Sequence, residues 1–455
     1  MTSLSAGQVV HALVTQKQEP EAFFGLPKGV AYCSTCTISN QRPNSCTEFK
    51  HDKNSKKETI SFNDDNVCDA CVFAKKKATV TDWEAREKIL WEVCNKHRST
   101  DGSYDCIVPS SGGKDSTMAA VLLKNKFGMH PLTVTWAPHI YTEVGFRNFQ
   151  HCIHAGFDNQ LFTPNGKVHR LLTRLAITNL LHPFQPFILG QKNLGAKMSL
   201  LYKIPLVFYG ENEAEYGNPV KENESGQRDA KYHSANENQY MDMTLGGVTV
   251  RDLISDYGIE MVDLLPYLPC PAAAVQKLGM EVHYMGYYIR WDPQEAYYFS
   301  VENSGFEANP ERTEGTHSKY NSLDDRIDGF HYWTTYVKFG IGRATYDTAQ
   351  EIRNKKITRE EGIMLVDKYD GEFPHKYFDE ILEYLDMTRE EWFTNSDKFR
   401  SPHLWRFDEE KKCWILKHTI LGKEKVCPST KYRDPNFEYR SNRKLLKYPK
   451  LFESE

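Results

Sequence analysis

A short glycine-rich segment carries the residues best suited to phosphate chemistry. Residues 110–117 read SSGGKDST and lie between an apolar run, YDCIVP, and a stretch with the spacing of an amphipathic helix. Glycines let the backbone approach a phosphate closely, and the free amides at a helix N-terminus point at it. The segment adds hydroxyl donors and one positive charge, from Ser111, Ser116, Thr117 and Lys114. Its spacing is too short for the G-x-x-x-x-G-K-S/T loop of P-loop ATPases, so it predicts a phosphate-binding loop of another kind.

Two cysteine pairs form the second chemical motif. Cys33 and Cys36 make one C-x-x-C pair, and Cys68 and Cys71 make another. Each pair can place two thiolates on one metal ion, and together they complete a closed four-sulfur shell, which predicts a structural zinc ion. Cys46 remains a possible substitute ligand, and buried or redox-active cysteines remain the alternative interpretation.

The glycine-rich loop resembles the S-G-G-x-D-S loop of the ATP pyrophosphatase (PP-loop) superfamily. The resemblance implies that the loop binds the pyrophosphate part of ATP and that the AMP part is transferred to a substrate oxygen. The implied nucleotide-binding residues are Ser111, Gly112, Gly113, Lys114, Asp115, Ser116 and Thr117. An adenine pocket is further implied at the end of the next apolar run, formed by Thr135, Trp136 and Ala137.

ATP arrives with Mg²⁺, an ion that prefers oxygen ligands and is usually held by one or two carboxylates together with phosphates. Asp115 lies inside the loop, and Glu211 follows the strand-like run IPLVFY. Because ligands collect at the carboxyl ends of parallel strands, we expect Asp115 and Glu211 to hold magnesium. Glu213 could replace Glu211, and a solvated carboxylate is the alternative for either glutamate.

Strand-like and helix-like segments alternate around these motifs. We expect strands at YDCIVP, PLTVTWAP, residues 160–163, IPLVFYGEN and EVHYMGYYIR, and helices near 114–128, 144–155, 167–181 and 190–202. Such alternation predicts an α/β fold with a parallel sheet covered on both faces. Capping boxes predict further helix starts at Thr81–Glu84, Thr358–Glu361 and Thr388–Glu391.

The predicted fold class is α/β, with a parallel-sheet PP-loop domain of the adenine nucleotide alpha-hydrolase-like kind, an N-terminal four-cysteine zinc module and a helical C-terminal region. We expect residues 1–80 to form an N-terminal arm and the zinc module, and residues 81–300 the PP-loop domain. Residues 301–422 would form a helical substrate-binding region, followed by a basic tail at 423–455. The polar stretch 221–239 is either a lid or a surface loop.

Composition and charge narrow the class of protein. The 455 residues are 40% hydrophobic and 13% aromatic, which excludes a wholly disordered chain. Lysine and arginine total 57 against 61 acidic residues, a near-balance that argues against a nucleic-acid-coating protein. No apolar run is long enough to span a bilayer, and the first residues lack a secretory signal pattern. Eleven cysteines in such a chain fit a reducing, cytoplasmic location.

Longer motifs extend the resemblance over roughly residues 32–401. They read YCSTCTISNQRP, CDACVFAKKK, VPSSGGKDST, FYGENEAEYGN, YYIRWDPQEAYYFS and SLDDRIDGFHYWTTYVKFGIGRATYDTAQEIR. Together they resemble the N-acetyl sugar amidotransferases of bacterial surface-polysaccharide (including lipopolysaccharide O-antigen) and nonulosonic-acid biosynthesis. This family converts an acetamido group on a sugar to an acetamidino group. The resemblance therefore implies an ATP-dependent amidotransferase that releases AMP and pyrophosphate.

The implied chemistry assigns roles to four residues. Lys114, together with Mg²⁺ and the loop amides, would neutralise charge as pyrophosphate departs, and Asp115 would hold the Mg²⁺. If the acceptor is a nucleotide-linked or acidic sugar, Lys338 and Arg343, beside glycines in YVKFGIGRATYD, would contact it. The alternative for this segment is a packed helix followed by a solvated turn.

Ammonia must come from elsewhere, because no glutaminase-type cysteine is evident: no G-x-C-x-G pattern is present, and residue 2 is Thr2. The resemblance implies a separate supplier similar to the glutaminase and cyclase subunits of imidazole glycerol phosphate synthase. A tRNA-thiolating enzyme, with Cys270 as its candidate thiol, is the competing hypothesis, and a non-catalytic zinc adaptor is a third.

Overall fold

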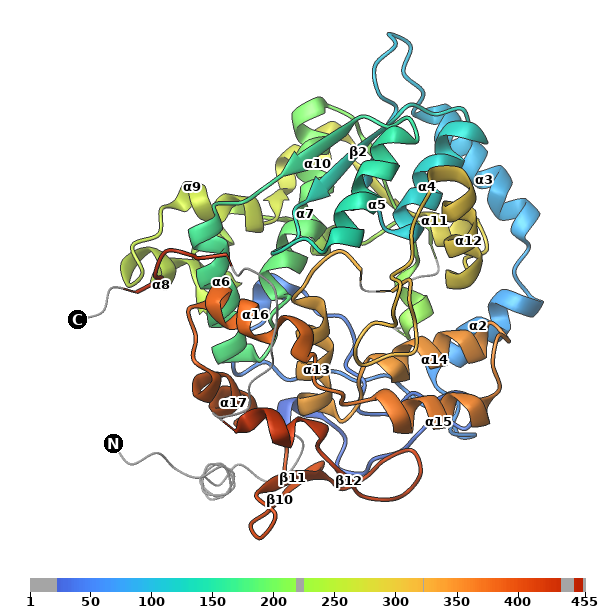
Figure 1. Cartoon of the computed structure of the whole chain (residues 1–455). Coiled ribbons are helices and arrows are strands. Elements are labelled where there is room, and N and C mark those ends of the chain that lie inside the picture. Colours follow the sequence, from blue (N-terminus) through green and yellow to red (C-terminus); the bar gives the residue numbers. More distant parts are fainter. Residues whose placement is uncertain (1–22, 218–224, 322, 435–445, 453–455) are drawn as a thin grey trace.

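The computed structural model of the protein describes residues 23–217, 225–321, 323–434 and 446–452 (Figure 1). At its centre lies a five-stranded parallel sheet of order β3-β2-β1-β4-β9. The strands are β1 (Cys106–Pro109), β2 (Pro131–Trp136), β3 (Asn159–Phe162), β4 (Leu206–Tyr209) and β9 (Glu281–Tyr284). Every predicted strand is present, and the α/β fold class is confirmed.

The central strands of the sheet are buried on both faces. Ile107 of β1 pairs with Leu132 and Val207 on the neighbouring strands and shares a core with α6 (Gly166–Leu180) and α7 (Gln185–Tyr202). Its neighbours Cys106 and Val108 point to the other face, where they pack with α3 (Trp83–Lys96) and α4 (Lys114–Asn125). This continuous burial explains the unbroken apolar runs in the sequence.

Chain order places a topological switch beside β1. The strands β1, β2 and β3 follow one another outward, and the chain then returns to put β4 on the other side of β1. The segments that leave β1 and β4 therefore diverge, and ligands of open parallel sheets bind at such a point. The loop of residues 110–113 follows β1, and Glu211 follows β4.

The remaining α-helices and strands between α4 and residue 305 are short or lie around the central sheet. They are α5 (Glu143–His154), α8 (Val250–Ser255), α9 (Met261–Leu264), α10 (Ala272–Leu278), α11 (Met285–Tyr288) and α12 (Pro293–Ser304), with β5 (Ser234–Ala235), β6 (Thr244–Leu245), β7 (Val248–Thr249) and β8 (Cys270–Pro271). Helices α4 and α12 lie side by side (Figure 1).

The cysteine motifs belong to a module that packs on the C-terminal helices. Helix α2 (Asp69–Thr79) begins inside the second cysteine pair and lies near α14 (Arg343–Arg353) in Figure 1. Thr37 contacts Thr348 of α14, with their hydroxyl oxygens 2.9 Å apart. Arg359, at the start of α15 (Arg359–Tyr369), donates to the backbone carbonyls of Cys33 and Cys36. The module is thus braced against the region where the substrate was expected to bind.

The C-terminal region is helical, but it also contains strands that were not predicted. Helices α13 (Asp328–Phe339), α16 (Phe378–Leu385) and α17 (Arg389–Asp397) share an aromatic core that includes Trp333 and Trp392. The capping boxes at Thr358 and Thr388 are confirmed. An antiparallel sheet follows: β10 (Trp405–Asp408), β11 (Cys413–Leu416) and β12 (Lys425–Val426).

Two local predictions are wrong. EVHYMGYYIR is a strand only through Tyr284 and continues as α11, since the amide of Gly286 donates to the carbonyl of Gly210 at 2.8 Å and turns the chain. The capping box predicted at Thr81 is absent because Asp82 is the N-cap of α3, its side chain accepting from the amide of Ala85 at 3.0 Å.

The polar stretch and the basic tail are partly described. Residues 221–224 and 435–445 lie outside the described residues. The remainder of the polar stretch includes β5, which pairs with β8, so it is fastened to the body of the protein. In the tail, Arg433 forms an ion pair with Asp397 at 2.6 Å and Lys450 forms one with Asp386 at 2.6 Å. These two tail cations therefore pair with this chain's own carboxylates.

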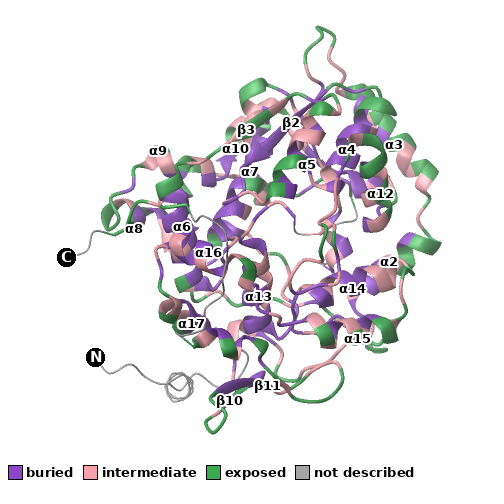
Figure 2. Cartoon of the chain, in the orientation of Figure 1, coloured by how far each residue is buried: buried purple, intermediate pink, exposed green. Residues whose placement is uncertain are grey.

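Figure 2 shows buried residues along the strands and on the inward sides of the helices. Nowhere in the described parts of the chain is there a helix with the length and apolar character needed to cross a bilayer.

Candidate active site

A cleft of about 640 Å³ lies at the carboxyl edge of the parallel sheet. One wall is formed by the loop of residues 110–116 and by the residues that end β2 and β4. The facing residues come from α13 and α14, including His331, Tyr332, Arg343 and Asp347. The cysteine module adds Arg42 and Ser45. Three parts of the sequence that are far apart therefore meet at one site.

The loop has the backbone of an anion-binding turn. Helix α4 begins at Lys114, and its N-cap, Gly113, has no side chain that could cap the first turn. The amides of its first turn are therefore free for a ligand. Gly112 adopts φ +84°, and a Cβ there would lie 2.6 Å from the carbonyl carbon of Asn148. The loop passes so close to α5 that only glycine fits at this position.

Most of the predicted nucleotide-binding residues line the cleft. These are Ser111, Gly112, Gly113, Lys114, Asp115, Ser116 and Trp136. The exceptions are Thr117, Thr135 and Ala137, which are buried and do not line it. Thr135 supports the loop from behind, its hydroxyl donating to the carbonyl of Ser110 at 2.5 Å. Of the predicted adenine pocket, only Trp136 faces the cleft, where it is joined by Val134 and Phe187.

Two carboxylates meet at the topological switch. Glu211 is half-buried, and burial together with the negative charge of Asp115 raises its pKa above the ordinary range. A Cβ on Gly210 would lie 3.1 Å from the backbone of Asp115, so the two chain segments are in close approach. The phenol of Tyr216 donates to Glu211 at 3.1 Å. A magnesium ion fits here because Asp115 and Glu211 offer hard oxygen ligands whose mutual repulsion a cation would relieve.

Asp115 is held in place on both of its oxygens. Lys114 Nζ lies 2.5 Å from one carboxylate oxygen, and the indole N–H of Trp291 donates to the other at 2.7 Å. Trp291 is 1% exposed. Its backbone carbonyl accepts from Lys77 Nζ at 3.0 Å, and Lys77 also pairs with buried Glu215 at 2.7 Å. A chain of contacts thus runs from α2 of the cysteine module to the phosphate loop.

The two predicted acceptor-binding residues have different positions. Arg343 lines the cleft, pairs with Asp347 at 2.9 Å and lies over the ring of Tyr332. Lys338 does not line it: the side chain is buried and donates to the carbonyl of Leu180 at 2.7 Å. Burial lowers the pKa of Lys338 to about 7. The prediction for Lys338 is therefore corrected, because its helical position faces the core of the C-terminal region.

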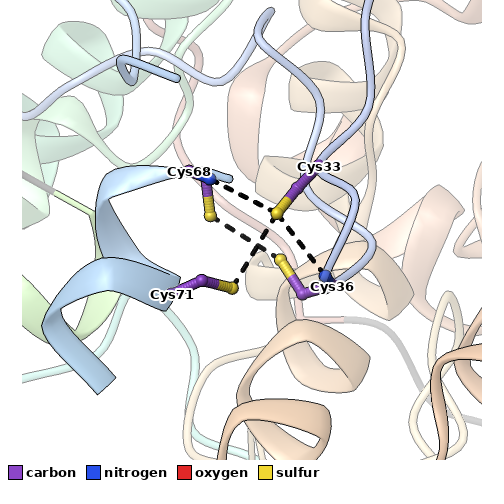
Figure 3. A group of neighbouring side chains, drawn as sticks. All are labelled: Cys33, Cys36, Cys68 and Cys71. Atoms are coloured by element: carbon purple, nitrogen blue, oxygen red, sulfur yellow. Dashed lines mark hydrogen bonds between the residues drawn. The ribbon is translucent and has the colours of Figure 1, made fainter. Parts of the chain in front are cut away.

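The four predicted zinc ligands converge (Figure 3). The sulfurs of Cys33 and Cys71 are 3.9 Å apart, those of Cys36 and Cys68 are 3.7 Å apart, and all four thiols are free and buried. A tetrahedral zinc–thiolate site with bonds of about 2.3 Å has sulfur–sulfur edges of about 3.8 Å. Backbone amides of Thr35, Cys36 and Cys68 point at the sulfur of Cys33. The cluster is consistent with a structural metal such as zinc.

Cys46 is not part of this cluster. Its sulfur lies 3.1 Å from Lys57 Nζ and 3.5 Å from a carboxylate oxygen of Glu48. Cys46, Glu48 and His51 could themselves form a three-ligand group, since their donor atoms lie within 4.8 Å of one another. The ammonium group of Lys57 already compensates the negative charge of Glu48 beside Cys46.

Sequence reasoning missed several cleft residues and their supports. Arg42 and Arg228 line the cleft, and Trp291, Lys77 and Glu215 brace Asp115. Four of these five lie inside the quoted motifs, within NQRP, AKKK, ENEAEYGN and IRWDPQ. The position of these charged or aromatic residues inside the quoted motifs was the signal that could have indicated a role at the site. Cys270, the candidate thiol of the thiolation hypothesis, is buried away from the cleft, and burial raises its pKa to about 11.

Two comparisons with known proteins bear on this site. An uncharacterized protein of the archaeon Methanocaldococcus jannaschii is 34% identical over 89 residues, which cover 20% of this chain and 31% of that protein. The chain therefore matches less than a third of the length of this relative. Residues 314–419 match the family model described as "LPS biosynthesis protein WbpG-like, C-terminal domain". The wall of the cleft that carries Arg343 is thus similar to the C-terminal domain of WbpG-like lipopolysaccharide biosynthesis proteins.

Proposed function

We propose that this protein is an ATP-dependent amidotransferase that converts an acetamido group of a nucleotide-linked or acidic sugar to an acetamidino group. The pathway would be the biosynthesis of a surface polysaccharide such as the lipopolysaccharide O-antigen, or of a nonulosonic acid. The observation that carries the proposal is the meeting of two parts at one cleft. The S-G-G-K-D-S loop forms one wall, and the region similar to a lipopolysaccharide biosynthesis domain faces it.

The proposed reaction activates a poor electrophile. The amide oxygen attacks the α-phosphorus of ATP, the bond between the α- and β-phosphates breaks, and pyrophosphate leaves. Ammonia then adds to the carbon of the O-adenylated imidate, and the carbon–oxygen bond breaks to release AMP. Overall, amide, ATP and ammonia give amidinium, AMP and pyrophosphate. The amide oxygen leaves as an oxygen of the AMP phosphate.

The described residues suit these steps. Lys114 and the uncapped amides of α4 can stabilise the charge on pyrophosphate as it departs. Asp115 and Glu211 are the residues that would hold Mg²⁺, which supplies further charge neutralisation when bound. Trp291 and Lys114 fix the orientation of Asp115 before the substrate arrives. Holding the acetamido oxygen in line with the α-phosphorus lowers the entropic part of the barrier.

The proposal includes a separate ammonia supplier, of the kind formed by the glutaminase and cyclase subunits of imidazole glycerol phosphate synthase. A glutaminase needs an activated thiol with a lowered pKa. Among the described residues, no cysteine lines the cleft. The half-buried thiol of Cys46 has a pKa that burial raises, which is the opposite of activation. The same observations argue against the thiolation hypothesis, which requires a reactive cysteine at the site of adenylation.

The test is acceptor-dependent formation of AMP. Purified protein receives ATP, Mg²⁺, ammonium chloride and one acetamido sugar from a panel of nucleotide-linked and acidic sugars, and AMP is measured by chromatography. We expect AMP with at least one sugar, and none when the acetyl group of that sugar has been removed. Glutamine should not replace ammonium unless the supplier is added. AMP formation that does not depend on the acetamido group would contradict the proposal.

A further inference from the structure

Two arginines in the cleft carry buried N–H groups that bond to no residue in the described part of the chain. Arg42 is 5% exposed and Arg228 is 7% exposed, and both line the cleft. Among the described residues, the Nε and Nη1 atoms of Arg42 and the Nε atom of Arg228 have no hydrogen-bond partner. Buried donors, and charged ones above all, are rarely left unbonded in a folded protein. Such donors at the wall of a cleft point to an anionic ligand.

The charges around the two arginines leave a positive excess. Glu213 is the carboxylate that acts on both guanidinium groups. Arg42 is further influenced by the cation Arg353 and by Cys68 of the cysteine cluster. Tyrosine rings surround both groups: Tyr346 lies near Arg42, and Tyr284, Tyr209 and Tyr232 lie near Arg228. Within the described ranges, one carboxylate therefore acts on two guanidinium groups, whereas Arg343 and Lys114 each have a carboxylate of their own.

Arg42 and Arg228 belong to other parts of the chain than the phosphate loop. Arg42 is anchored in the cysteine module, where its carbonyl accepts from Ile60 at 2.9 Å and its amide donates to Ser39 at 3.1 Å. The amide of Arg228 donates to Val282 of β9 at 2.7 Å. The loop has its own cation in Lys114, so the two arginines are available for a different anion.

We propose that Arg42 and Arg228 form a subsite for the anionic part of the sugar acceptor, either the diphosphate of a nucleotide sugar or a sugar carboxylate. The inference rests on the proposed function and names the groups that recognise its substrate. A guanidinium fork matches the oxygens of a carboxylate or a phosphate, and Glu213 helps to orient the two forks. The cysteine module then contributes directly to acceptor binding through Arg42, besides stabilising the fold.

The experiment is a calorimetric titration of the full-length, metal-loaded protein saturated with Mg²⁺ and α,β-methylene ATP, which occupies the phosphate loop. The probes are UDP-N-acetylglucosamine for the diphosphate, N-acetylneuraminic acid for the carboxylate, and N-acetylglucosamine as the neutral sugar. We expect one anionic probe to bind about tenfold or more tightly than the neutral sugar. The better anionic probe identifies the source of the anion.

Substitutions assign this preference to the subsite. Arg42→Gln and Arg228→Gln should each weaken the anionic probe about tenfold and leave the neutral sugar and the ATP analogue unchanged. Arg42→Lys should restore part of the affinity because it keeps the charge. Arg251→Gln is the matched control, since Arg251 is an exposed residue on α8 paired with Asp242. Metal content and melting temperature of Arg42→Gln should equal those of the wild type.

Three results would overturn the inference: no anionic probe binds more tightly than the neutral sugar, Arg42→Gln leaves the preference intact, or Arg42→Gln weakens the ATP analogue as much as the anionic probe. The last result would assign the arginine to ATP. The titration needs no turnover, so its outcome is separate from that of the proposed function. An anion preference that depends on Arg42, without any AMP formation, would contradict the proposed reaction and leave the subsite standing.

Discussion

The hydrogen bond between Trp291 and Asp115 gives the sharpest single perturbation of the phosphate loop. Trp291→Phe keeps an aromatic ring in the buried site but removes the indole N–H that donates to Asp115 at 2.7 Å. Asp115 would retain only its contact with Lys114 among the described side chains. Its carboxylate would then be free to turn away from the cleft.

The expected loss of activity follows from the negative charge of Asp115, which accepts this hydrogen bond. A hydrogen bond to an ionised group contributes about 1.5–3 kcal/mol. If that contribution is lost from the reacting complex, the rate of AMP formation falls about 10- to 150-fold. Binding of Mg²⁺ with α,β-methylene ATP should weaken in the same direction, because Asp115 is a proposed magnesium ligand.

The assay compares AMP formation and calorimetric binding of the ATP analogue in Trp291→Phe with those in a matched control. Trp392→Phe serves as the control: Trp392 is also fully buried and lies in the C-terminal core, but its indole N–H has no partner among the residues that the structure describes. We expect both variants to retain metal and fold, and only Trp291→Phe to lose activity.

A rate for Trp291→Phe within about twofold of the control would refute the reasoning, since about twofold is far below the loss expected for a charged hydrogen bond. A loss of activity that tracks a fall in melting temperature equally in both variants would also refute it. The effect would then come from packing.

Three further predictions concern the supports of the site. Cys36→Ser should lose the bound zinc, expected at about one per chain, together with much of the stability, because zinc binding in small modules contributes about 10 kcal/mol or more to folding. Cys46→Ser is the control and should keep the zinc. Metal analysis and thermal melting of both variants test this prediction. Lys77→Met leaves the buried Glu215 without its ion pair, so it should lower the free energy of unfolding in urea by about 3–5 kcal/mol. Adding Glu215→Gln should restore part of the lost stability. If the effects of the two substitutions are simply additive, the pairing is contradicted. Burial lowers the pKa of His317, but its hydrogen bond to Glu351 at 2.9 Å outweighs burial and raises it. The pair therefore stabilises the fold fully below the unfolded pKa of histidine, about 6.5, and stabilises it less as pH rises through the folded pKa. Glu351→Gln should accordingly lower the melting temperature more in mildly acidic than in alkaline buffer. An equal loss of melting temperature in both buffers contradicts the pairing.

The sequence predicts the central sheet and the phosphate loop because their signals are local. Unbroken apolar runs mark strands buried on both faces, and the glycines of residues 110–117 mark the turn before α4. The cysteine spacing predicts the four-sulfur cluster for the same reason: two short turns bring the ligands together in pairs. The signal for each feature lies in residues close in the sequence, although the sulfur contacts themselves join distant residues, Cys33 with Cys71 and Cys36 with Cys68.

Other features depend on contacts between distant segments. Nothing near Trp291 in the sequence indicates that its indole bonds to Asp115, or that its carbonyl accepts from Lys77. Lys338 was misassigned because the glycines that follow it suggest an open site, whereas α13 turns this side chain toward Leu180. Strands β10 to β12 were missed because they are short and their register is set by pairing with one another.

The fate of the amide oxygen tests the central claim most directly. An acetamido sugar labelled with heavy oxygen in its amide is incubated with the protein, ATP, Mg²⁺ and ammonium chloride, and AMP, inorganic phosphate and the sugar are analysed by mass spectrometry. Adenylation of the amide predicts one heavy oxygen in AMP, none in inorganic phosphate, and a sugar in which oxygen has been replaced by an NH group. Unlabelled AMP, or label that appears in inorganic phosphate, would contradict the account.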